Sequence, residues 1–307
     1  NFSRITPAPG AGLAWVFDPA TGMLRVVESS AALDSRIVNL SVLTTVSTIE
    51  PRVIVGLVIG GAGTSGGQPL LVRAVGPSLA VFGVPDVLPD PKLELYSGSA
   101  IVAANDDWAG AAALRTAFAQ VGAFGYLSAG TKDAAVLLGS LSSGGYSVHV
   151  TGTDGSAGGV LVELYDSTPA EQITPTTPRL LNVSVLKPIP PDGLLTVGFV
   201  LASTSEKQVL IRAIGPALAA APFNLPGTMA DPKLDVFRGQ TLIATNDNWG
   251  GGTDLAAVFA RTGAFALPAG SKDAAVLVTL QPGAYTALVS GANDTSGVAL
   301  VEVYEVP

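Results

Sequence analysis

The chain has 307 residues and a formal net charge of −8, with 48% hydrophobic and only 13% charged residues. The negative charge argues against nucleic acid and anionic membranes as partners, and no run reaches the ~18 apolar residues of a membrane helix. The lack of cysteine excludes disulfides and cysteine-based metal sites, while an apolar, weakly charged surface is expected to contact other subunits.

Residues 1–35 are expected to form an N-terminal extension containing a β-hairpin. Apolar segments 13–17 and 23–27 flank the turn sequence 18–22, which contains Asp, Pro and Gly. An isolated hairpin is marginal in water, so this one packs on its own domain, is a remnant of an upstream domain, or pairs with a neighbouring molecule. The residues expected to make an assembly contact are Leu13, Trp15, Phe17, Met23, Leu24 and Val26.

The remainder of the sequence consists of two copies of one repeat, at residues 36–166 and 179–307. The first copy carries the segments Arg-Ala-Val-Gly-Pro, Asp-Pro-Lys-Leu, Asn-Asp-Asp-Trp and Lys-Asp-Ala-Ala, and the second repeats each of them about 140 positions later. Residues 167–178 contain three prolines and are expected to be an extended linker.

Short alternating segments bounded by turn residues predict about eight strands in each copy. In the first copy they are expected at 36–43, 52–59, 70–75, 93–96, 100–104, 134–141, 146–151 and 160–165. One short helix is expected where Leu114, Phe118 and Val121 follow helical spacing. The prediction is an all-β protein with two tandem antiparallel β-sandwich domains, jelly-roll-like, plus the N-terminal hairpin.

Arg73 and Arg212 lie within apolar strands, where a charge must be paired. We expect structural ion pairs with Asp133 and Asp273, with Asp106 and Asp247 as alternative partners. An anion-binding site is the competing interpretation.

Acidic turns precede the expected helices. Their clustered side-chain oxygens suit Ca²⁺, although Asx-turns and a helix N-cap explain the same residues. The possible metal ligands are Asn105, Asp106, Asp107, Asn246, Asp247 and Asn248. Trp108 and Trp249, which follow these turns, are expected to plug the sandwich ends, with sugar stacking as the alternative.

The sequence does not support an enzyme. His149 is the single histidine, and Leu288 stands at its place in the second copy. Serine–histidine catalysis and a histidine-based zinc site therefore have little support, and duplication of the candidate acids favours a structural role. We expect no catalytic residues and no cofactor other than possible Ca²⁺.

The repeated pattern extends to Gly-Ala-Phe, Gly-x-Tyr and Val-Glu-(Leu/Val)-Tyr and covers nearly all of residues 36–305. It resembles a repeat of large secreted and surface proteins of environmental bacteria. Segments 93–165 and 234–304 also look like the bacterial pre-peptidase C-terminal β-sandwich domain. Each unit here is longer than that domain, and we expect no attached peptidase domain. The second resemblance implies an extracellular accessory sandwich, some relatives of which bind Ca²⁺.

These observations favour an extracellular structural subunit that assembles with itself into a surface fibre or layer by β-strand addition between subunits. The alternative is a secreted module that binds glycan or matrix polymer, with or without Ca²⁺.

Overall fold

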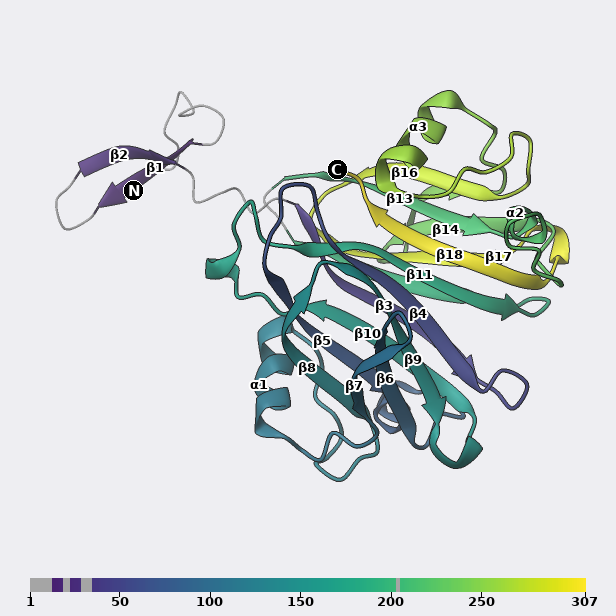
Figure 1. Cartoon of the computed structure of the whole chain (residues 1–307), viewed down its shortest axis with the longest axis horizontal. Helices are drawn as coiled ribbons and strands as arrows, with labels where there is room; N and C mark the ends of the chain where they lie inside the picture. Colours follow the sequence, from purple (N-terminus) through teal and green to yellow (C-terminus); the bar gives the residue numbers. More distant parts are fainter. Residues whose placement is uncertain (1–12, 19–22, 29–34, 203–204) are drawn as a thin grey trace.

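The computed structural model describes residues 13–18, 23–28, 35–202 and 205–307, with side chains described from residue 35 onward. The all-β class is confirmed (Figure 1). In the first repeat the strands are β3 (Arg36–Val46), β4 (Arg52–Gly60), β5 (Gly67–Val75), β6 (Pro91–Ser97), β7 (Ala100–Asn105), β8 (Ala134–Ser142), β9 (Gly144–Gly152) and β10 (Gly158–Asp166). In the second they are β11 (Arg179–Ile189), β12 (Leu195–Ala202), β13 (Lys207–Ile214), β14 (Pro232–Arg238), β15 (Thr241–Asn246), β16 (Ala274–Leu280), β17 (Gly283–Gly291) and β18 (Gly297–Glu305).

Each expected strand of the first repeat is present, and most extend one to three residues further than predicted. The expected helix is α1 (Ala112–Val121), and its copy is α3 (Thr253–Thr262). Both end at a glycine in the left-handed conformation, Gly122 and Gly263, as helix C-termini commonly do. A short α2 (Pro216–Ala219) follows β13. No helix in the described part of the chain is long and apolar enough to cross a membrane.

The sixteen strands of the two repeats form two runs, each of eight neighbouring strands that pair antiparallel. One has the order β8-β5-β10-β3-β12-β17-β14-β15 and the other β16-β13-β18-β11-β4-β9-β6-β7. The two runs are connected by one residue pair, Leu180 on β11 with Ile37 on β3, and so form one sixteen-stranded sheet. That each repeat is a jelly-roll-like sandwich stays a prediction.

Both runs cross from one repeat to the other. β4 pairs with β11 (Figure 1), and β3 pairs with β12. The first two strands of each repeat therefore have a partner in the other repeat. At these junctions Ser184 Oγ lies 2.5 Å from the position a Cβ would take at Gly56, and Ser41 Oγ lies equally close to Gly198. The glycines therefore allow the neighbouring serines to lie across the strands.

The largest group of buried apolar side chains belongs to both repeats, from Ile37 on β3 to Val303 on β18. Each helix encloses a smaller apolar cluster against the strands of its own repeat, around Trp108 in the first and Trp249 in the second. Because the main core is shared and strands pair across the repeats, the two repeats stabilise each other. The linker, residues 167–178, also forms hydrogen bonds with the first repeat. Ser167 N–H donates to Pro69 O, and Ser65 N–H donates to Thr176 O.

The predicted hairpin is confirmed as local structure. β1 (Leu13–Asp18) and β2 (Met23–Glu28) pair antiparallel and form a two-stranded sheet of their own. The register places Trp15 opposite Val26 and Phe17 opposite Leu24. The expected loop at 19–22 lies outside the described residues.

Candidate functional site

The repeated motifs converge on a buried arginine in each repeat, near the C-terminal end of β5 and of β13. Arg73 lies opposite Glu163 on β10, and Arg212 lies opposite Glu302 on β18. Both arginine side chains are fully buried. The predicted ion pairs therefore exist, but the partners are glutamates.

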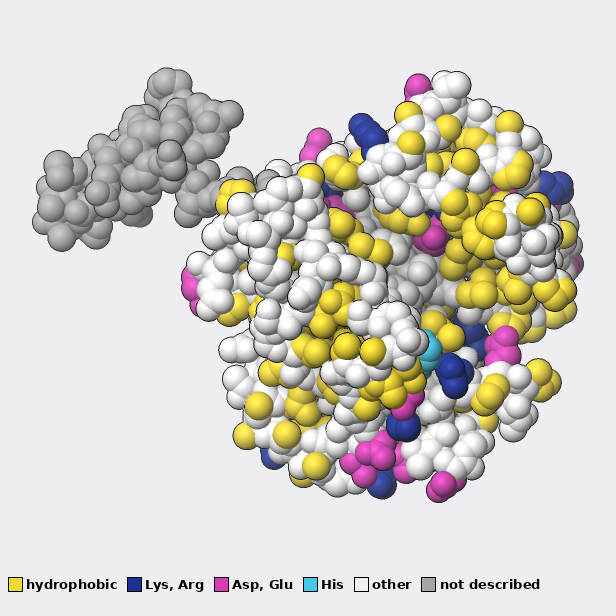
Figure 2. Space-filling model, in the orientation of Figure 1, with side chains coloured by type: hydrophobic (Ala, Val, Ile, Leu, Met, Phe, Trp, Pro, Cys, Tyr) yellow, Lys and Arg dark blue, Asp and Glu magenta, His cyan; other side chains and the backbone are white. Residues whose placement is uncertain are grey.

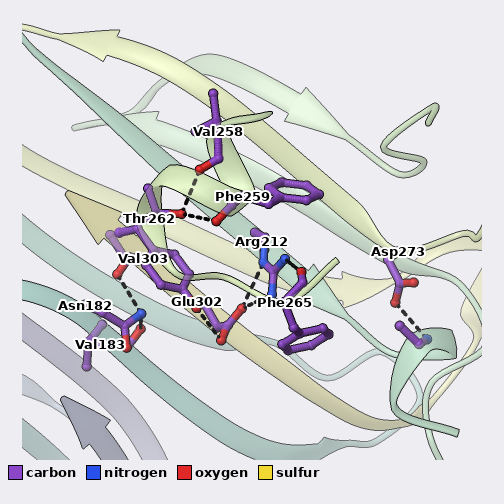
Figure 3. Close-up of polar contacts among 12 residues, drawn as sticks. Asn182, Val183, Arg212, Val258, Phe259, Thr262, Phe265, Asp273, Glu302 and Val303 are labelled. Carbon is purple, nitrogen blue, oxygen red and sulfur yellow. Dashed lines mark hydrogen bonds and ion pairs between the residues drawn. The ribbon is translucent and has the colours of Figure 1, made fainter. Parts of the chain in front are cut away.

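The two clusters differ in how well the guanidinium is satisfied. In the second repeat, Glu302 Oε2 accepts from Arg212 Nε at 2.9 Å and from Nη2 at 2.6 Å, and Phe265 O accepts from Nη1 at 2.5 Å (Figure 3). In the first repeat, Arg73 Nε lies 3.4 Å from Glu163 Oε2 and 3.3 Å from Tyr126 Oη, while both Nη atoms have no hydrogen-bond partner. The second cluster is the better-made ion pair.

Aromatic rings enclose both guanidinium groups. The Arg73 Cζ lies 4.4–4.5 Å from the ring centres of Phe118, Phe124 and Tyr126. The Arg212 Cζ lies 4.8 Å from the Phe259 ring and 4.5 Å from the Phe265 ring. Cation–π attraction is stronger when the cation is desolvated, so the rings compensate part of the cost of burying each charge.

Burial also alters the titration of the groups around the arginines. Desolvation raises the pKa of Glu163 above 4.5, opposed by the positive charge of Arg73 and the hydrogen bond from Tyr165. Burial likewise raises the pKa of the tyrosines that bond to these glutamates, Tyr165 and Tyr304. Both phenols therefore stay protonated and donate to the carboxylates at 2.7 and 2.8 Å.

A pH titration of Glu163→Gln tests the raised pKa. Because its pKa is raised, the Glu163 carboxyl holds its proton more tightly in the folded protein than in the unfolded chain. The stability that this gives is lost as pH rises from about 4.5 through the pKa of the folded state. We expect the free energy of unfolding of the wild type to fall relative to Glu163→Gln over that window, as measured by urea unfolding at each pH. If the difference in free energy of unfolding between the wild type and Glu163→Gln stays constant from pH 4 to 8, the pKa of Glu163 is not raised.

The predicted partners Asp133 and Asp273 were wrong, and they have another role. Asp133 precedes β8, whose first residue, Ala134, pairs with Ala74, so its carboxylate lies beyond Arg73 at the end of β5. There Oδ1 accepts from the backbone N–H groups of Gly76 and Ser78, at 2.9 and 3.1 Å. Asp273 accepts in the same way from the backbone N–H groups of Gly215 and Ala217, at 2.8 and 3.2 Å. The alternative partners, Asp106 and Asp247, form no ion pair with either arginine.

Only a glycine fits at the Gly-Pro step that these aspartates hold. A Cβ at Gly76 would lie 2.1 Å from Leu88 O, and one at Gly215 would lie 2.1 Å from Met229 O. Because both obstacles are backbone atoms, they cannot rotate away. The motif Arg-Ala-x-Gly-Pro thus combines a buried cation with a turn anchored by a buried carboxylate.

The acidic turns are tied into the fold through their asparagines. Asn105 Oδ1 accepts from Ala135 N–H at 3.0 Å, and Asn246 Oδ1 accepts from Ala275 N–H at 2.9 Å. Their amide groups donate to the backbone carbonyls two residues later, at Asp107 and Asn248. The expected helix N-cap was wrong, because Ala111 and Gly252 precede the helices without a side-chain cap.

Calcium binding at these turns stays a prediction. The Asn105 and Asn246 oxygens already accept protein hydrogen bonds, and Asp107 pairs with Lys132 at 2.8 Å. Asp106 and Asp247 are exposed. Within the residues that the structure describes, no group of three or more His, Cys, Asp or Glu is placed to hold a metal ion.

Both tryptophans are core residues, as expected. Trp108 is 4% exposed and Trp249 is 7% exposed. Their indole N–H groups donate to Ser128 O and Pro268 O, each at 3.1 Å. Both indoles are therefore part of the core, and sugar binding at these positions stays a prediction.

His149 lies on the outer face of β9, where Tyr96 stacks on it with ring centres 4.3 Å apart. Ser147 Oγ lies 3.0 Å from its Nε2, while Nδ1 has no hydrogen-bond partner. A serine–histidine pair needs an acid that orients the imidazole through the other nitrogen, and none is placed here. That the protein is not an enzyme stays a prediction.

The comparisons with known proteins give no family. No family model and no curated protein matches the chain. Among solved structures, PNGF-II has a TM-score of 0.21 at 9% identity, over 89% of this chain and 66% of that one, so the chain spans just under two thirds of its length. The coconut allergen cocosin has a TM-score of 0.19 at 6% identity, over 88% of this chain and 86% of that one. Vicilin from Corylus avellana (hazelnut) has 0.17 at 5%, over 89% and 83%. Likenesses this low carry no argument.

Proposed function

We propose that this protein is a non-enzymatic structural subunit that joins copies of itself into a surface fibre or layer by β-strand addition. The observation that carries the proposal is the separate hairpin. Among the described strands, β1 and β2 pair only with each other, while the other sixteen share one sheet. Two short strands alone are marginal in water, so a hairpin of this composition gains stability by joining another sheet.

The surface of the body supports association with a partner. Large apolar side chains are exposed on strands at the ends of both runs, including Ile101 (52%) on β7 and Leu242 (49%) on β15. Figure 2 shows apolar side chains over both repeats on the face in view, with charged groups in small clusters. Exposed apolar surface with little charge is typical of a protein that is covered in its assembly.

The buried arginine clusters support a structural role. Each guanidinium contacts a glutamate and aromatic rings of its own repeat, so the most strongly repeated residues of the sequence serve the fold. A hairpin that adds to a different surface on the next copy makes a head-to-tail contact, which produces an open filament when the rotation does not close. The resemblance to repeats of secreted bacterial surface proteins supports an extracellular location.

Deleting residues 1–30 is expected to abolish self-assembly and leave folded monomers, because it removes both strands of the hairpin. Light scattering and negative-stain microscopy measure the assembly, and circular dichroism measures the fold. The matched control is Arg25→Gln, which retains the hairpin and is expected to assemble. If the deletion variant still forms assemblies of normal size, the hairpin is not the assembly element.

A further inference from the structure

The ends of the two runs leave four strands, β7, β8, β15 and β16, with a partner on one side only among the described strands. Natural proteins usually protect such edges with charged residues, proline or a β-bulge. These four strands contain no Asp, Glu, Lys, Arg or Pro. Asparagine side chains cover one backbone N–H on β8 and one on β16, since Asn105 Oδ1 accepts from Ala135 N–H and Asn246 Oδ1 accepts from Ala275 N–H. Along the rest of each edge, backbone irregularity is the remaining protection.

Three of the four edges have that irregularity. The pairing of β6 with β7 shifts register between Leu95 and Tyr96, and that of β14 with β15 shifts between Val236 and Phe237. The pairing of β5 with β8 shifts between Gln68 and Leu70. In contrast, β16 pairs with β13 through seven consecutive residues, from Ala274 to Leu280, without a shift. A bulge bends a strand and increases its twist, so β16 is the regular edge.

The side chains of β16 also leave apolar surface to cover. Val276 and Val278 are only partly buried while they pack against the main core. Leu277, which points to the opposite face of the strand, is 36% exposed. Ala275 N–H already bonds to Asn246 Oδ1, so a strand added beside β16 would continue the hydrogen-bond ladder from Val276 onward and cover side chains on both faces.

We infer that β16 is the acceptor edge for a second copy of this chain, and that β1 of that copy is the strand that adds to it. This inference rests on the proposed function. β1 has six residues against the seven of β16, and its sequence is uncharged until Asp18, whereas β2 carries Arg25 in its middle. The chain already makes such contacts internally, since β12 of one repeat adds antiparallel to β3 of the other over seven residue pairs.

The first test places a lysine on the edge. Leu277→Lys is expected to reduce assembly at least tenfold, because a charge on an edge strand opposes the approach of another strand. The matched control is Leu137→Lys at the same place in β8, where the side chain is 42% exposed. This control is expected to assemble like the wild type. Thermal melting confirms that both variants fold, and equal assembly of the two variants overturns the choice of β16.

The second test uses the absence of native cysteine. Copies carrying Ala14→Cys are mixed with copies carrying Leu277→Cys and treated with a short bifunctional maleimide. We expect a crosslinked dimer of one copy of each kind, and none when Leu277→Cys is replaced by Leu137→Cys. Suppose that deletion of residues 1–30 abolishes assembly, but Leu277→Lys assembles normally and no crosslinked dimer forms with Leu277→Cys. The hairpin then adds to another strand, and only the choice of β16 as acceptor is wrong. If the deletion also has no effect, the proposed function itself fails.

Discussion

Replacing Glu302 with alanine is expected to lower the free energy of unfolding by about 3–5 kcal/mol, because it leaves the buried cation of Arg212 without its counter-charge. Glu302 accepts two hydrogen bonds from this guanidinium and one from Tyr304. After the substitution, Phe265 O and the aromatic rings are the contacts left to the cation. Urea unfolding at neutral pH measures the loss.

The first repeat supplies the matched control. Glu163→Ala is expected to cost less than Glu302→Ala, because Arg73 keeps its contact with Tyr126 and its three rings, and its ion pair is longer at 3.4 Å. The double variant Arg212→Met with Glu302→Leu is expected to recover most of the loss, since a well-packed apolar pair often replaces a buried ion pair without cost. If Glu302→Ala lowers the free energy of unfolding by less than about 1 kcal/mol, the loss is that of a surface ion pair. That result would contradict a role for Glu302 as the counter-charge of the buried Arg212.

Replacing Asp133 with alanine is expected to destabilise the protein by a similar amount, about 3 kcal/mol or more. The change removes a charged acceptor from two buried backbone N–H groups, at Gly76 and Ser78, and each unsatisfied buried donor costs about 1–3 kcal/mol. Ser78 Oγ also donates to this carboxylate at 2.5 Å and accepts from Leu127 N–H, so the loop before β8 loses its support.

Ser78→Ala separates these contributions. It retains the two backbone bonds to Asp133 and removes only the hydroxyl, so we expect a loss of about 1 kcal/mol. The second repeat already has alanine at this position, Ala217, and Ser271 Oγ donates to Asp273 at 2.6 Å instead. Equal losses for Asp133→Ala and Ser78→Ala would mean that the backbone bonds contribute nothing.

The sequence alone predicted the strands, the two helices and the hairpin, because each depends on local spacing of apolar and turn residues. It also placed the buried arginines and the core tryptophans. It gave the wrong partner for Arg73 because strand register, which sets Glu163 opposite it, depends on pairing between segments 90 positions apart. The repeated Val-Glu-(Leu/Val)-Tyr segment was the available signal, since a charge alternating with buried apolar residues needs its own counter-charge.

The duplication, the all-β class and the local elements were therefore determined by the sequence of each repeat. Only the tertiary structure decided which repeat supplies the second neighbour of β3 and β4. The two copies have the same alternating pattern, so β3 finds equivalent apolar partners in β4 and in β12, and nothing local distinguishes them. The choice depends on packing over the shared core and on close approaches such as Ser41 over Gly198. For the same physical reason, the regular edge of β16 became visible only once its pairing with β13 was known.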